Sequence, residues 1–102
     1  MNTRIHYLYR DASNYKFSGS FVVKGGIGRE HLQPFLHENG WFIPKKVGLN
    51  HLLTEPWDEE EDHSLHELCE FEVTEDRDCV CTAKELIRRF QLASKNWFGG
   101  WE

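Results

Sequence analysis

Apolar residues recur at every second position in two runs near the start of the chain, and this pattern constrains the fold more than any other feature. In residues 4–10, Ile5, Tyr7 and Tyr9 alternate with other residues, which is the period of a half-buried β-strand. The pattern resumes from residue 15 to residue 23, with Gly19 at one apolar position. The Asp-Ala-Ser-Asn stretch between the runs has the chemistry of a turn. The two runs therefore predict a β-hairpin.

Two later segments also predict strands. Cys69, Phe71 and Val73 alternate with glutamates, so we expect a strand with one charged face and with Cys69 on the core side as a small apolar residue. The apolar residues 41–43 are followed by Pro44, which cannot donate to a sheet ladder. A short strand at an edge or a bulge is expected there.

The C-terminal part predicts an amphipathic helix. Thr82 and Glu85 have the spacing of a capping box, in which both side chains accept backbone N–H groups at the helix start. Apolar residues then follow at helical spacing, namely Ala83, Leu86, Ile87 and Phe90. This helix should pack on the sheet.

A second helix is expected within residues 29–40, where Leu32, Phe35 and Leu36 share one helical face and Gly40 can end the helix. Pro34 must then lie in the first turn or kink the helix. The predicted fold class is α+β, with the order β-β-α-β-β-α, a small mainly antiparallel sheet and both helices on one face. A length of 102 residues predicts a single domain, 1–102.

Charge is distributed very unevenly along the chain. Residues 55–78 contain twelve acids and one base, a net formal charge of −11, whereas the remainder holds five acids and eleven bases, a net charge of +6. If residues 55–66 form a mobile acidic loop on one side of the fold, the surface is dipolar. We expect the protein to bind a macromolecular partner, such as a basic protein, through an acidic face formed by Asp58, Glu59, Glu60, Glu61, Asp62, Glu70 and Glu72.

The same segment contains two histidines three residues apart, His63 and His66. Imidazole and carboxylate groups are ligands of divalent ions, so the alternative prediction is a divalent-metal-binding protein or metal-dependent enzyme. Its ligands would be His63, His66, Asp62 and Glu67, with His51 as a further ligand. Otherwise the histidines anchor the end of the acidic loop. No catalytic motif is present, and the leading prediction includes neither catalysis nor a cofactor.

A polar set surrounds the predicted hairpin turn and is flanked by tyrosines. Such a set can bind a ligand, although turn capping and local ion pairs explain it more simply. Its members are Arg10, Asp11, Asn14 and Lys16.

Three stretches resemble a family of short bacterial proteins of unknown function. They are YLYRDASNYK at 7–16, GWFIPKKVGL at 40–49 and EDHSLHEL at 61–68. The resemblance covers residues 7 to about 90 and rests on the Tyr-Arg-Asp…Asn-Tyr-Lys opening and the acidic Asp-His…His-Glu segment. It implies a small stand-alone bacterial protein and brings no activity, cofactor or catalytic residues.

The remaining features bear on location and assembly. The three cysteines form an odd set without the spacing of a secreted disulfide framework, and no apolar run reaches the length of a signal peptide or membrane span. We expect a cytoplasmic protein with no membrane contact, and nucleic acid is a poor fit to its acidic charge. The aromatic tail 96–102 is expected to fold over the core or to mediate a homodimer.

Overall fold

A computed structural model of the whole chain describes residues 1–38, 40–53, 56–58, 60 and 62–97. Its strands are β1 (Asn2–Arg10), β2 (Lys16–Lys24), β3 (Trp41–Phe42), β4 (His66–Thr74) and β5 (Cys81–Thr82). Three short 3₁₀ helices, η1 (Arg29–His31), η2 (Gln33–Phe35) and η3 (Pro44–Val47), and one α-helix, α1 (Ala83–Ala93), complete the described elements.

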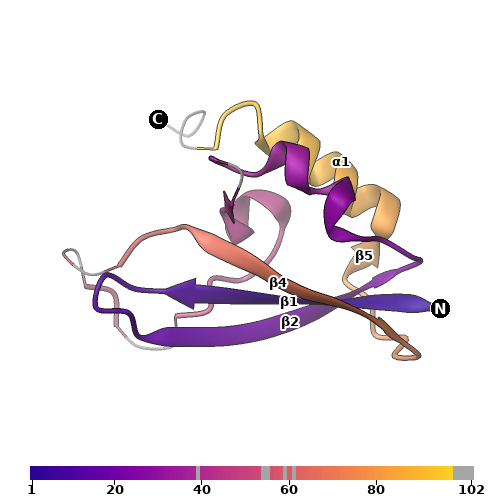
Figure 1. Cartoon of the computed structure of the whole chain (residues 1–102), viewed down its shortest axis with the longest axis horizontal. Coiled ribbons are helices and arrows are strands. Elements are labelled where there is room, and N and C mark those ends of the chain that lie inside the picture. The colour runs from indigo at the N-terminus through magenta and orange to yellow at the C-terminus, as the bar shows by residue number, and fades with distance from the viewer. Residues whose placement is uncertain (39, 54–55, 59, 61, 98–102) are drawn as a thin grey trace.

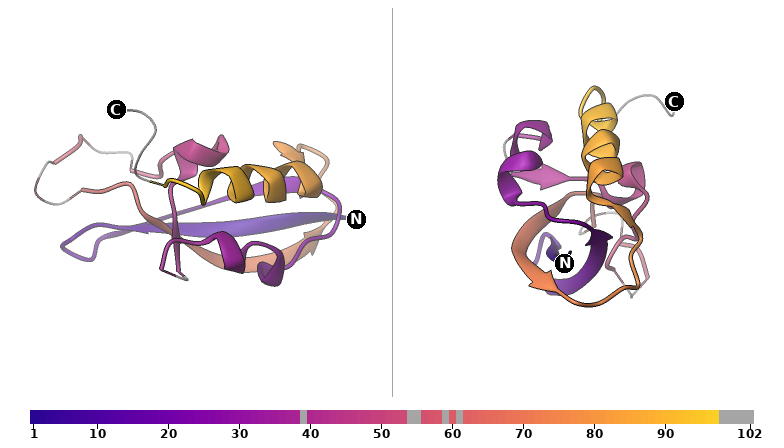
Figure 2. Two further views of the ribbon diagram at one scale, coloured as in Figure 1. Left: turned by 90° about the horizontal axis from the view of Figure 1, so that it is seen from above. Right: turned by 90° about the vertical axis from the view of Figure 1, so that its right-hand side faces the viewer.

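The strands form one sheet in the order β3-β4-β1-β2-β5. The long strand β1 pairs antiparallel with both β2 and β4, whereas β2 and β5 are parallel. The sheet is strongly curled, and the helical segments lie together over its open side (Figures 1 and 2). The predicted fold class is therefore wrong, because the described residues form mostly a mixed, curled sheet with one short α-helix rather than a two-helix α+β domain.

The predicted helix within residues 29–40 is the main source of this error. The segment forms η1 and η2, which are joined at Leu32, and Leu36 already has extended backbone with ψ of 145°. Pro34 lacks the N–H that an α-helix needs and disfavours the helical conformation of the residue before it. The apolar residues are buried all the same, since Leu32 is 0% and Leu36 is 7% exposed.

The predicted hairpin is confirmed, with β1 and β2 paired from Thr3↔Val23 to Arg10↔Lys16. Gly19 lies opposite Tyr7 on the core-facing side. A Cβ at this glycine would lie 2.6 Å from Cδ2 of Leu52, so Leu52 occupies the space that a side chain would fill. The missing side chain thus lets the segment after η3 cross the hairpin.

A β-bulge in β4 changes which of its residues face the core. Tyr7 pairs with Leu68 but Ile5 pairs with Phe71, so Cys69 and Glu70 together oppose a single residue of β1. The bulge moves Leu68 to the core side, where it is 6% exposed, and leaves Cys69 exposed. The prediction of Cys69 as a core residue is therefore wrong. It assumed that apolar and charged residues alternate along the whole strand, and that pattern does not reveal a bulge.

The α-helix packs its apolar stripe into the core as predicted. Leu86 and Phe90 are 0% exposed, and the Phe90 ring lies 5.3 Å from that of Phe42. Thr82 Oγ1 accepts the Glu85 N–H at 3.0 Å, but the Glu85 carboxylate binds arginines of the helix instead of completing the capping box. Within the described residues, no helix has the length and apolar character that crossing a bilayer requires.

Candidate functional site at the hairpin end

The β1–β2 turn and the segment that precedes β4 meet at one end of the sheet, away from the N-terminus (Figure 1). We call this region the hairpin end and define it as the described residues of 10–16 and 51–66. Most of the residues singled out in the sequence lie here. It contains the polar hairpin set, the described acids of the 55–66 segment and three histidines.

Asp11 organises the turn. Its Oδ1 accepts the N–H groups of Ser13 and Tyr15, both at 2.9 Å, and its backbone oxygen accepts the Asn14 N–H at 3.0 Å. Asn14 adopts the left-handed conformation with φ of 69°, which asparagine tolerates better than most residues. These two members of the polar hairpin set are thus committed largely to the turn.

Tyr9, close to the end of β1, links the hairpin to the acidic segment. Its side chain is 0% exposed, and its hydroxyl donates to Asp62 Oδ1 at 2.6 Å and accepts the His63 N–H at 3.1 Å. The Asp58 N–H donates to the other Asp62 oxygen at 2.8 Å. Burial, followed by the bond to Asp62, raises the pKa of Tyr9 to about 12. The Tyr9 hydroxyl, followed by the Asp58 amide, lowers the pKa of Asp62.

Three histidines surround the Tyr9 ring. The rings of His51, His63 and His66 lie 4.5, 5.1 and 5.0 Å from it, measured between centroids. His51 and His66 are themselves 4.5 Å apart in an edge-on arrangement. The sequence spacing of His63 and His66 did signal a shared location, but only the fold adds Tyr9 to the set.

Each of these rings is held between two backbone groups. The N–H groups of Leu53, Leu65 and Leu52 donate to one ring nitrogen of His51, His63 and His66, at 3.0, 3.1 and 3.1 Å respectively. The other ring nitrogens lie 2.8, 2.8 and 3.0 Å from the backbone oxygens of His63, Arg10 and Ser64. A ring that accepts one bond and donates the other is neutral and has used its lone pair.

This arrangement bears directly on the metal hypothesis. A histidine must offer a lone pair to bind an ion, and the three lone pairs here receive backbone N–H groups. Among the described residues, no group of three or more His, Cys, Asp or Glu side chains has the geometry to hold a metal. The geometry favours the other interpretation, in which the histidines anchor the end of the acidic segment.

His66 is the most deeply buried of the three. It is 0% exposed, and this burial lowers its pKa to about 4. Its Nε2 accepts the Leu52 N–H, and Leu52 in turn occupies the space above Gly19. The neutral ring therefore ties the crossing segment to the first residue of β4.

Two surface hollows flank the hairpin turn. One, of about 360 Å³, is lined by Asp11, Ser13, Tyr15, Leu53, Pro56, Asp58 and Asp62. The other, of about 380 Å³, is lined by Arg10, Asp11, Trp41, His63, Leu65 and Glu67. Three carboxylates and one tyrosine ring meet in the first hollow, and Trp57 is 49% exposed in the same segment.

The acids of β4 differ from those of the hairpin end because they are matched by bases of β1. Glu72 lies 2.6 Å from His6 Nε2 and 4.0 Å from Arg4 Nε, and Glu67 lies 3.6 Å from Arg10 Nε. Glu70 is exposed in the bulge. Glu59 and Glu61 of the predicted acidic face lie outside the described residues, as do Thr54 and Glu55.

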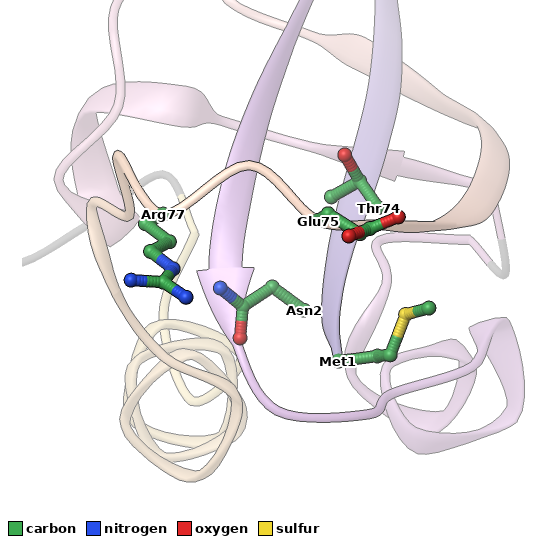
Figure 3. A pocket seen from close by; sticks show the side chains of 5 residues that line it. All are labelled: Met1, Asn2, Thr74, Glu75 and Arg77. Atoms are coloured by element: carbon green, nitrogen blue, oxygen red, sulfur yellow. The ribbon is translucent and has the colours of Figure 1, made fainter.

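A further hollow lies at the opposite end of the sheet, lined by Met1, Asn2, Thr74, Glu75 and Arg77 (Figure 3). Asn2 Nδ2 donates to the backbone oxygen of Asp76 at 2.8 Å. None of the residues that line this hollow was predicted as a site residue from the sequence.

Of the aromatic tail, the structure describes only the beginning. Trp97 is 5% exposed, packs edge-on against Phe90 and donates from Nε1 to the Phe35 backbone oxygen at 3.0 Å. This residue folds back onto the core. Residues 98–102 lie outside the described part, so the homodimer stays a prediction.

Comparison of the sequence with protein-family models finds no match, and comparison with curated proteins and with solved structures finds no significant similarity. The resemblance to a bacterial family stays a prediction. Its opening motif coincides with the end of β1 and the turn, and its acidic motif with the segment that Tyr9 binds.

Proposed function

We propose that this protein is a non-catalytic binding module that recognises a basic segment of another protein at the hairpin end. The observation that carries the proposal is the hollow between the turn and the acidic segment. It combines the carboxylates of Asp11, Asp58 and Asp62 with the ring of Tyr15, which is 71% exposed.

The negative charge of the hairpin end is not neutralised by ion pairs among the described residues. Among the residues that the structure describes, no ion pair joins Asp11, Asp58, Glu60 or Asp62 to a base. The acids Glu67 and Glu72, in contrast, lie against bases of β1. A cationic partner therefore meets negative charge that no ion pair compensates at the hairpin end, whereas the charges of Glu67 and Glu72 are compensated by their neighbouring bases.

Exposed aromatic rings beside carboxylates suit lysine and arginine side chains. A cationic head group is attracted to the face of a tyrosine or tryptophan ring as well as to carboxylates. Tyr15 lines the hollow, and Trp57 is half-exposed in the segment that forms its other wall. Phosphate-rich nucleic acid is repelled by the same charges.

Fluorescence anisotropy with a labelled, flexible peptide of alternating arginine and glycine tests this proposal. We expect saturable binding that weakens as salt is raised from 50 to 300 mM, because screening shortens the reach of exposed charges. Replacing Glu60→Lys together with Tyr15→Ala should weaken binding by roughly tenfold.

Lys84→Glu, a charge change on α1 away from the hairpin end, provides a matched control that should not weaken binding. Equal affinities of the doubly substituted and unaltered proteins would contradict the proposal. So would binding that is indifferent to salt. A cytoplasmic location and a bacterial source are parts of the same proposal.

A further inference from the structure

We infer that the outer edge of β4, from Glu70 to Thr74, is a docking site for an extended basic segment of a partner protein, which adds a strand to the sheet. This goes beyond the proposed function, because it uses a different surface and backbone pairing rather than the hollow at the hairpin end. Strand addition to an open edge is a recurrent way of binding peptides.

The edge is only partly covered. β4 is nine residues long, yet β3 pairs only with its first two residues, His66 and Glu67. The guanidinium of Arg29 donates to the next two backbone oxygens, those of Leu68 and Cys69, at 2.8 and 2.6 Å. Beyond them, no strand within the described part of the chain pairs with this edge. Its outward N–H and C=O groups are a template for another strand.

Along the open edge, apolar side chains on the core-facing side of β4 are left partly or largely exposed to solvent. Phe71 is partly buried, with Arg29 5.7 Å from its ring centroid. Val73 lies opposite Thr3, which is 4% exposed, yet Val73 itself is 69% exposed. An apolar side chain of an added strand would cover Val73 and continue the layer begun by Phe71.

Charge decides which strand fits. Glu70, Glu72 and Glu75 are all exposed along or just beyond the edge. A second copy of this chain pairing here would bring glutamates against glutamates, which is unfavourable across strands. A strand in which lysine or arginine alternates with apolar residues instead places its cations beside Glu70, which is exposed and forms no ion pair among the described residues, and its apolar side chains beside Val73.

The test uses a fluorescein-labelled ten-residue peptide in which lysine alternates with valine or threonine. We expect saturable binding by anisotropy and slower hydrogen exchange of the amides in residues 70–74. Glu70→Lys should weaken binding by roughly fivefold. Glu38→Lys makes the same charge change at an exposed residue outside both this edge and the hairpin end, and it should leave the affinity within about twofold.

Peptide variants test backbone pairing without altering the protein. N-methylation of every second residue in one phase should abolish binding, whereas methylation in the other phase should preserve it, because only one edge of the peptide pairs with β4. A peptide with glutamate in place of lysine should not bind.

Binding that survives methylation in both phases would overturn the inference, as would protection confined to the hairpin end. Self-association that protects residues 70–74 without peptide would overturn it in favour of a second copy. Failure of this test leaves the proposed function intact if the arginine–glycine peptide still depends on Glu60 and Tyr15.

Discussion

The hydroxyl of Tyr9 donates a 2.6 Å hydrogen bond to Oδ1 of Asp62, 53 residues further along the chain. Through this contact a buried strand residue holds the acidic segment against the hairpin. The same hydroxyl accepts the backbone N–H of His63, so one oxygen joins the core, the acidic segment and the histidine cluster.

Replacing Tyr9→Phe should lower the free energy of unfolding by about 1–2 kcal/mol, because it leaves the His63 N–H without its acceptor and removes the donor to Asp62. Urea unfolding followed by circular dichroism measures this change. Tyr15→Phe removes the same atom from a side chain that is 71% exposed. Similar losses in the two variants would show that the Tyr9 hydroxyl has no special role.

The buried histidine predicts a loss of stability in mild acid. The pKa of His66 is about 4 in the folded protein and about 6.5 in an unfolded chain. Because the folded pKa is lowered, the stability linked to His66 is fully present above pH 6.5 and is lost as the pH falls towards 4. The loss by pH 4 amounts to about 3 kcal/mol.

Urea unfolding at intervals between pH 7.5 and pH 4 measures this dependence. His66→Gln retains a donor and an acceptor but does not titrate, so its stability should change less with pH than that of the unaltered protein. His6→Gln, a change at a histidine on the outer face of the sheet, should retain the dependence. If the His66 variant kept the full slope, another group would be responsible.

Gly48 ends η3 in the left-handed conformation with φ of 80°, and a Cβ there would lie 2.8 Å from Nη1 of Arg89. Gly48→Ala should therefore destabilise the protein by about 1–2 kcal/mol. Gly26 has no atom within 4 Å of an added Cβ and no positive φ, so Gly26→Ala should be nearly neutral. Thermal unfolding compares the two, and equal melting temperatures would refute the strain at Gly48.

Trp97 closes the core beside Phe90 and binds the Phe35 backbone oxygen through Nε1. Trp97→Ala should cost about 3–5 kcal/mol, as expected when a buried aromatic side chain is removed. Trp57→Ala, at a ring that is 49% exposed, should cost less than about 1 kcal/mol. Chemical unfolding of both variants provides the comparison, and a small effect at Trp97 would mean that the ring is not part of the core.

Features that depend on near neighbours were predictable from the sequence. The alternation around Ile5 and Tyr7, the Asp-Ala-Ser-Asn turn and the apolar stripe through Leu86 and Phe90 all arise from spacings of two to four residues. The corresponding hairpin and helix are present. Pro44 likewise predicted an edge position for the short strand before it, and β3 lies at the edge of the sheet.

Features that depend on distant partners were decided only by the tertiary structure. Cys69 is exposed because the pairing of β4 with β1 includes a bulge at this point. The turns around Pro34 bury Leu32 and Leu36 without an α-helix. The histidines drew attention as possible ligands, but their ring nitrogens are used by backbone groups that the fold brings to them. Local periodicity specifies which face of an element is apolar, whereas the hydrogen-bond partner of a buried polar group depends on how those elements pack.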